Sequence, residues 1–155
     1  YDHLAHRRFP VTVWIRTRAE LDYLVEPDLF HDFFGHVPLL TDPVFADYMQ
    51  AYGRRAIAAG LDNIHRLARL YWFTVEFGLI KNPGGPRIYG NGIISSSGET
   101  QHSLTGKVKK IAYRPETLAA QPYDIWHFQD TLFVIESFDQ LETEFIRWAR
   151  DHKLL

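Results

Sequence analysis

Two histidines and one glutamate are the residues of this sequence best suited to chemistry. His31 and His36 lie five positions apart, and Glu76 follows forty positions after His36. Two imidazoles and one carboxylate form the facial triad that holds Fe(II) with open coordination positions, and the same residue types also make catalytic zinc sites. The residue types therefore indicate a metal site and leave the choice between iron and zinc open.

The spacing of the two histidines does not by itself bring them together. In an ideal α-helix five residues turn through roughly 500°, so the two imidazoles would point about 140° apart. They can share a site only if the helix ends or distorts near Gly35, or if His36 points inward from a segment that Pro38 redirects. The structural alternative is that one histidine caps a helix and the other packs in the core.

The surroundings of Glu76 favour burial. It lies in the largely aromatic and aliphatic run Tyr71–Phe77, and on a helix its neighbours one and two turns earlier are Trp72 and Ala68. A buried carboxylate is costly unless it is paired or bound to a metal. Glu76 is therefore either a metal ligand in an aromatic-walled pocket or a partly exposed residue of an amphipathic helix.

The composition narrows the classes of function. The chain has 155 residues, of which 46% are hydrophobic and 15% aromatic, so it suits one domain over 1–155 with a sizeable core. It contains no cysteine, which excludes a disulfide scaffold, zinc fingers and thiol catalysis. Its net charge of -2 offers no basic excess, so we expect no nucleic-acid partner.

The sequence carries no signal for a membrane or for export. No apolar run approaches the length of a membrane span, and no signal peptide precedes the first motif. We therefore expect a cytoplasmic protein without a membrane partner, and a monomer, because no obvious coiled-coil tail follows Trp148. The chain opens at Tyr1 without Met, and we expect it to be N-terminally incomplete.

Helical signals dominate the first half of the chain. Leu29–His36 is predicted to be a short helix that Pro38 stops. A second helix is predicted to begin at Pro43, in a region that Gly53 and Gly60 break up. A long helix is then predicted over 62–79 with Asp62 as its N-cap.

The remaining segments are predicted to be shorter. Phe9–Ile15 is β-branched and aromatic and could be extended, although Pro10 argues against a central strand. Asn82–Pro86 is a clear turn, and a closing helix begins at Ser137 with Gln140 completing a capping box. Short extended pieces are predicted between these two at Arg87–Tyr89, Ile93–Ile94, Val108–Tyr113, Trp126–Phe128 and Leu132–Ile135. The predicted fold class is mainly α with a small β component (α+β).

Three long blocks carry a resemblance to a known family. Glu26–Leu39, Leu67–Leu79 and Tyr89–Glu99 resemble, in order and spacing, the signature segments of the pterin-dependent aromatic amino acid hydroxylases, and bacterial phenylalanine 4-hydroxylases most. The resemblance extends from Leu4 to about Phe138. It implies a single catalytic domain of this type, of which the chain is the C-terminal portion.

The resemblance implies a role for each matching residue. His31, His36 and Glu76 match the iron ligands. The residues that match substrate-binding positions are Arg16, which would hold the substrate carboxylate, Asp28, which would steady Arg16, and Trp72, Phe77, Ser95 and Glu99. The residues that match pterin-side positions are Tyr71, Asp32 and Ala68. The family pattern also implies that much of the pterin pocket comes from residues upstream of the segment Leu4–Trp14.

The implied activity is hydroxylation of L-phenylalanine, a small aromatic amino acid, to L-tyrosine. The implied cofactors are Fe(II) and tetrahydrobiopterin or another reduced pterin, with O2 as cosubstrate. The indole of Trp72 narrows the pocket toward a single ring, and the apolar Ile125 offers no charged partner to a phenol. Both features favour phenylalanine over tryptophan and tyrosine.

Three alternatives remain open. The chain could belong to a tryptophan or tyrosine hydroxylase of the same family. It could instead be a catalytically idle iron-binding core that lacks part of the pterin site. A zinc hydrolase is the weakest alternative, because the sequence has no His-Glu-x-x-His motif.

Overall fold

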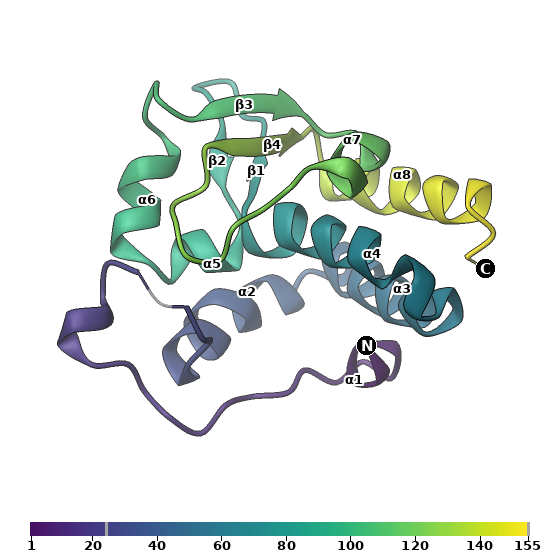
Figure 1. Cartoon of the computed structure of the whole chain (residues 1–155), viewed down its shortest axis with the longest axis horizontal. Coiled ribbons are helices and arrows are strands. Elements are labelled where there is room, and N and C mark those ends of the chain that lie inside the picture. Colours follow the sequence, from purple (N-terminus) through teal and green to yellow (C-terminus); the bar gives the residue numbers. More distant parts are fainter. Residues whose placement is uncertain (24, 155) are drawn as a thin grey trace.

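Helices surround one side of a small sheet in the computed structural model, which describes residues 1–23 and 25–154 (Figure 1). The predicted fold class, mainly α with a small β component, is confirmed. None of the helices in these residues is long and apolar enough to cross a membrane.

Helix α3 (Pro43–Ala59) is the centre of the helical part. Asp42 caps it by accepting hydrogen bonds from the N–H groups of Val44 and Phe45. The prediction that Gly53 breaks this helix is wrong. A Cβ on Gly53 would lie 2.4 Å from the backbone nitrogen of Ala5, so the glycine instead lets helix α1 (Asp2–Ala5) pack directly on α3. Gly60 ends the helix with a φ of 64°, as expected.

The long helix predicted over 62–79 consists of three pieces. A 3-10 turn, η3 (Leu61–Asn63), precedes α4 (Ile64–Tyr71), and α4 widens into a π-helix, η4 (Trp72–Glu76). The N-cap of α4 is Asn63, not Asp62. The last predicted turn is wrong because Gly78 begins strand β1 (Gly78–Ile80). A Cβ on Gly78 would lie 2.1 Å from the ring of Tyr89, so only glycine lets the chain turn there.

The sheet has the strand order β2-β1-β4-β3. Strand β1 pairs antiparallel with β2 (Arg87–Ile88) and parallel with β4 (Thr131–Ile135), and β3 (Lys109–Ala112) also pairs parallel with β4. The turn Asn82–Pro86 joins β1 to β2, as predicted. Phe133 packs into the main core, whereas its neighbour Leu132 packs with Phe77 in a smaller cluster on the other face.

The second half of the chain is more helical than predicted. The strands expected near Val108–Tyr113 and Leu132–Ile135 are present, but Ile93–Ile94 belongs to helix α5 (Asn91–Ile94) and Trp126–Phe128 forms no strand. Helices α6 (Ser97–Ser103) and α7 (Pro115–Ala120) were not predicted, because helices this short show too few apolar repeats.

The closing helix α8 (Phe138–Asp151) begins as predicted at Ser137, whose Oγ accepts a hydrogen bond from the backbone of Gln140. The Gln140 side chain accepts from the N–H of Glu136 rather than from Ser137, so the capping box is only half formed.

The N-terminal segment follows the outside of the molecule. From α1 it runs along the lower edge in Figure 1, through a short 3-10 turn, η1 (Arg18–Glu20), to the vicinity of α6. Phe9–Ile15 forms no strand within the described residues. The segment returns toward the helices at Asp28, which binds Arg16.

Candidate metal and substrate site

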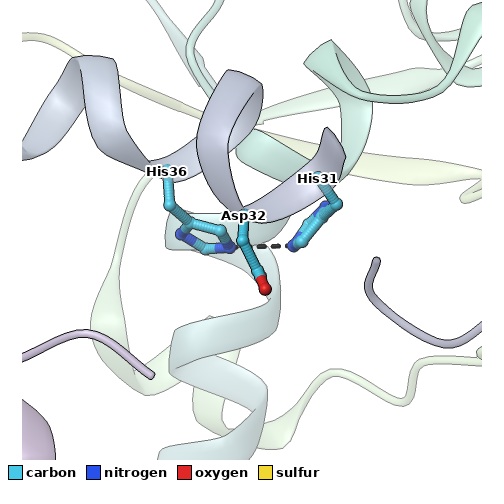
Figure 2. A group of neighbouring side chains, drawn as sticks. All are labelled: His31, Asp32 and His36. Carbon is cyan, nitrogen blue, oxygen red and sulfur yellow. Dashed lines mark hydrogen bonds between the residues drawn. The ribbon is translucent and has the colours of Figure 1, made fainter. Parts of the chain in front are cut away.

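His31 and His36 face each other because the helix between them is a π-helix, η2 (His31–His36). Hydrogen bonds of a π-helix join residues five apart, which brings residues with this spacing to one side. The N–H of Val37 accordingly bonds to the carbonyl of Asp32, and the two Nε2 atoms lie 2.8 Å apart (Figure 2). Of the two alternatives that could bring the histidines together, the helix distortion near Gly35 is the one present. Pro38 does not stop the helix, which continues as α2 (Val37–Leu40).

Glu76 reaches the histidine pair from the end of the second π-helix. The N–H of Phe77 bonds to the carbonyl of Trp72, five residues earlier, and this closes η4 next to Glu76. Its Oε1 lies 3.1 Å from Nε2 of His36, and its Oε2 lies 3.5 Å from Nε2 of His31. Two ligand types from segments forty positions apart thus converge on one point.

The electrostatics of this cluster suit a cation. Burial lowers the pKa of His31, although the Glu76 carboxylate opposes that shift. Burial would raise the pKa of Glu76, but His36 and His31 outweigh it, so the pKa of Glu76 lies below its ordinary value. A neutral imidazole and an ionised carboxylate are the forms that bind a divalent metal.

Asp32 is a further carboxylate beside the same histidines. Ligand atoms of His31, Asp32 and His36 all lie within 4.8 Å of one another (Figure 2). However, one oxygen of Asp32 accepts the N–H of Thr12 at 2.7 Å. Glu76 approaches both Nε2 atoms and is therefore the better third ligand by geometry.

Hydrogen bonds hold the outer nitrogen of each imidazole. Nδ1 of His31 lies 2.8 Å from Oγ of Ser95, and that hydroxyl donates to the backbone carbonyl of Asn91 at 2.9 Å. Nδ1 of His36 lies 2.8 Å from the side-chain nitrogen of Asn91. Asn91 was not predicted to take part in the site, and the sequence offered no signal for it.

Arg16 and Asp28 form a buried ion pair rather than a surface pair. Nε and Nη2 of Arg16 donate to the two carboxylate oxygens of Asp28 at 2.9 and 2.7 Å, and Nη1 donates to the carbonyl of Ser95. Burial would raise the pKa of Asp28, but hydrogen bonds from Arg16 and from the N–H of His31 hold it well below the ordinary range. The arginine is thereby fixed next to η2.

A cavity of about 240 Å³ opens beside this cluster. Five of the six predicted substrate residues line it together with His31 and Glu76: Arg16, Trp72, Phe77, Ser95 and Glu99. Asp28, the sixth, does not line the cavity but accepts two hydrogen bonds from Arg16. The Trp72 indole stacks on Phe77 at 4.6 Å and on Tyr123 at 4.7 Å between ring centroids, and its N–H donates to Gln129.

Glu99 brings a second carboxyl group to the cavity. One of its oxygens accepts the N–H of Gln129 at 3.3 Å, and the other has no hydrogen-bond partner among the described residues. Burial raises the pKa of Glu99 to about 7, although the Gln129 N–H acts in the opposite direction. The group is poised between its neutral and ionised forms near neutral pH.

A second cavity of about 370 Å³ lies between the N-terminal segment and α4. Ala68 and Tyr71, two of the three predicted pterin-side residues, line it, and Tyr71 and Trp72 also border the first cavity. Leu4 and Phe9 form part of its other side, and the ring of Phe9 lies 4.4 Å from that of His36. Asp32 is not among its lining residues.

Other lining residues of the first cavity were not predicted: Tyr23, Val25, Pro27, Gly92 and Ser96. The first three lie in a stretch without regular structure, where periodicity gives no signal. Ile125, which the sequence placed near the substrate ring, does line the cavity.

Residues 1–154 match the protein family described as biopterin-dependent aromatic amino acid hydroxylase. The phenylalanine-4-hydroxylase of Ralstonia nicotianae is 54% identical over 143 residues, which cover 91% of this chain and 46% of that protein. The chain spans about half the length of such relatives.

Two solved structures of phenylalanine hydroxylase from Chromobacterium violaceum are similar to this chain. One, with bound iron(III) and oxidised 7,8-dihydrobiopterin, is 50% identical with a TM-score of 0.90, over 97% of this chain and 56% of that one. The other, with bound iron and phenylalanine, is 46% identical with a TM-score of 0.86, over 98% of this chain and 57% of that one.

Proposed function

Because the chain belongs to the biopterin-dependent aromatic amino acid hydroxylases, we propose that it is the iron- and substrate-binding portion of an enzyme that converts L-phenylalanine to L-tyrosine. One observation carries the proposal. His31, His36 and Glu76 converge on one point, next to a cavity that combines aromatic walls with a fixed arginine.

The metal in this proposal is Fe(II), held by the two imidazoles and the Glu76 carboxylate. Three protein ligands would hold the ion and leave room for further ligands. Bound there, Fe(II) supplies the activation of O2 together with a reduced pterin. The task of the chain's own residues is to bind and orient the reactants and to exclude water.

Arg16 is proposed to bind the carboxylate of the amino acid substrate. A guanidinium has five N–H donors, and Asp28 and Ser95 accept three of them. Because Arg16 lines the cavity, its two remaining donors are proposed to bind the substrate carboxylate there, and the two hydrogen bonds to Asp28 keep the plane of the guanidinium fixed. Glu99 offers a carboxylate to the substrate ammonium, which would favour the ionised form of this side chain.

The aromatic walls of the first cavity are proposed to select phenylalanine. Trp72 and Phe77 suit one six-membered ring, and Ile125 presents no charge to a phenol. Differences in pocket volume are worth about 1–3 kcal/mol, so the preference should be moderate.

The second cavity is proposed to take the pterin. Ala68, Tyr71 and Phe9 give it apolar and aromatic sides suited to a flat heterocycle, and the ring of Phe9 packs against His36. Asp32, between Thr12 and the histidine pair, is proposed to face the pterin from the metal side.

Product analysis tests the proposal. The Fe(II)-loaded chain is supplied with O2, tetrahydrobiopterin and phenylalanine, tryptophan or tyrosine in turn. We expect kcat/KM to be highest for phenylalanine and lowest for tyrosine, and Trp72→Phe to shift activity toward tryptophan. Trp126→Phe, which changes an exposed indole, is the matched control. Iron binding without any hydroxylated product would favour the idle core, and a wild-type preference for tryptophan would favour the tryptophan hydroxylase alternative.

A further inference from the structure

We propose that Asn91 is a positioning residue for His36, with an amide that serves the imidazole both before and after a metal binds. This inference rests on the proposed metal site. Asn91 is the first residue of α5 and lies 55 positions from His36 in the sequence, yet its side-chain nitrogen is 2.8 Å from Nδ1 of the ring. Asn91 is fully buried and His36 is 2% exposed, so no water competes for this contact.

Glycines allow Asn91 to reach this position. A Cβ on Gly35, within η2, would lie 3.1 Å from the carbonyl oxygen of Asn91 and 3.3 Å from its Cβ. On either side of Asn91, a Cβ on Gly90 or Gly92 would lie 2.5 or 3.1 Å from the carbonyl oxygen of Glu76. The start of α5 is thus wedged between the two π-helices that carry the proposed ligands.

The hydrogen-bond partners of the two rings indicate which nitrogen of each imidazole carries the proton. The Ser95 hydroxyl donates to the Asn91 carbonyl, so it accepts from Nδ1–H of His31 and leaves Nε2 of that ring with a lone pair. Nε2 of His36 faces this lone pair at 2.8 Å and Glu76 at 3.1 Å, so it carries the proton. His31 thus offers its Nε2 lone pair toward the site, whereas His36 offers its own only when its proton lies on Nδ1.

The side-chain N–H of Asn91 suits the tautomer of His36 that carries its proton on Nε2. With the proton on Nε2, Nδ1 is an acceptor and receives the Asn91 N–H. The Asn91 oxygen meanwhile has no hydrogen-bond partner within the described part of the chain. When Nε2 binds a cation, the proton must sit on Nδ1, which then needs an acceptor. A half-turn of the amide supplies one, because its nitrogen and oxygen exchange places.

Metal titration of variants tests this role. Co(II) is the probe, followed by its visible absorption and by calorimetry. Asn91→Leu keeps the volume but removes the hydrogen bond, and we expect it to bind Co(II) about 10–100-fold more weakly. Asn91→Asp keeps an acceptor for Nδ1–H, and we expect it to stay close to wild type. A purely structural role gives the reverse order, because a core position tolerates leucine better than a carboxylate.

Nitrogen-15 NMR of the Zn(II)-loaded protein provides a second measurement that packing alone would not change. The Nδ1–H of His36 should be observed and should exchange slowly with water, and in Asn91→Leu, which keeps the buried volume, it should exchange faster. Asn82→Leu, in the exposed turn, is the matched control.

The outcomes separate the two proposals. If wild type and His36→Ala bind Co(II) equally, the metal site itself is wrong. If wild type binds through His36 but Asn91→Leu binds as tightly, or if His36 in the loaded protein carries no proton on Nδ1, only the role of Asn91 is overturned. Should Asn91→Leu not fold, the Asn91→Asp titration and the NMR measurement decide the question.

Discussion

Asp32 and Glu76 both bring a carboxylate to the histidine pair, and they differ in what else they bind. Asp32 is committed in part to the N–H of Thr12, whereas the two oxygens of Glu76 each face one Nε2 atom. We expect Glu76→Gln to weaken Co(II) binding more than about 100-fold. Loss of a ligand should cost more than the roughly 10–100-fold that is typical of a residue that only hydrogen-bonds to a ligand. Asp32→Asn should cost less. Calorimetric titration of both variants checks this, and the opposite order would make Asp32 the third ligand.

Glu99 should make the stability of the protein depend on pH. Its pKa is about 7 in the folded protein, against 4.5 for an ordinary glutamate. Between these values the unfolded chain has released a proton that the folded protein keeps, so the free energy of unfolding falls as pH rises through this window. Glu99→Gln should remove this fall.

Urea denaturation at about pH 5 and about pH 8 measures the effect. The variant should gain stability relative to wild type between the two values, and Glu26→Gln, at an exposed position, should not. A constant difference across that range would mean that Glu99 titrates normally.

Residue types indicated the proposed ligands, and the family resemblance indicated Asp28, Ser95 and Glu99, but nothing in the sequence indicated Asn91. Imidazoles and a carboxylate in an aromatic run are recognisable without a fold. The amide of Asn91 matters through a long-range contact to His36 that no local pattern contains.

At the scale of elements, Gly53 connects the N-terminal segment to the helical core. A Cβ there would collide with the backbone of α1, and Leu4 in this helix and Tyr1 just before it line the second cavity. We expect Gly53→Ala to displace α1 and to weaken binding of 7,8-dihydrobiopterin, measured by fluorescence titration, while Co(II) affinity stays unchanged. Gly84→Ala, where a Cβ meets nothing within 4 Å, is the matched control. Equal weakening of both ligands would mean that the whole fold is disturbed.

Elements with strong local signals were predicted well and those shaped by tertiary contacts were not. Strand β4 and helix α8 have apolar repeats and a cap that act locally. The start of β1 depends on the close approach of Gly78 to Tyr89, and α5 depends on glycines that pack against Glu76. Each contact joins residues more than ten positions apart, so no local sequence pattern reveals it.

Considered as a whole, the molecule places its candidate metal site where three separate segments meet. η2 contributes His31 and His36, η4 contributes Glu76, and the start of α5 contributes Asn91. A ligand that binds only the folded state stabilises it, by about 2.7 kcal/mol at one hundred times its Kd. Co(II) should therefore raise the Tm of wild type in a concentration-dependent way. His31→Ala should show no such rise, and an equal rise in both would place the cation elsewhere.

The two π-helices also make the site sensitive to the length of the chain. Each contains one residue more per turn than an α-helix would, and this extra residue turns a ligand toward its partners. Relaxation of η2 to a regular α-helix of the same length would turn His36 about 140° away from His31, because five residues of α-helix turn through roughly 500°. Deletion of Phe34 should instead leave the two histidines four positions apart on one face of an α-helix, so the site should tolerate the loss of one residue from η2 better than the insertion of one, a difference that no scan of point substitutions would reveal.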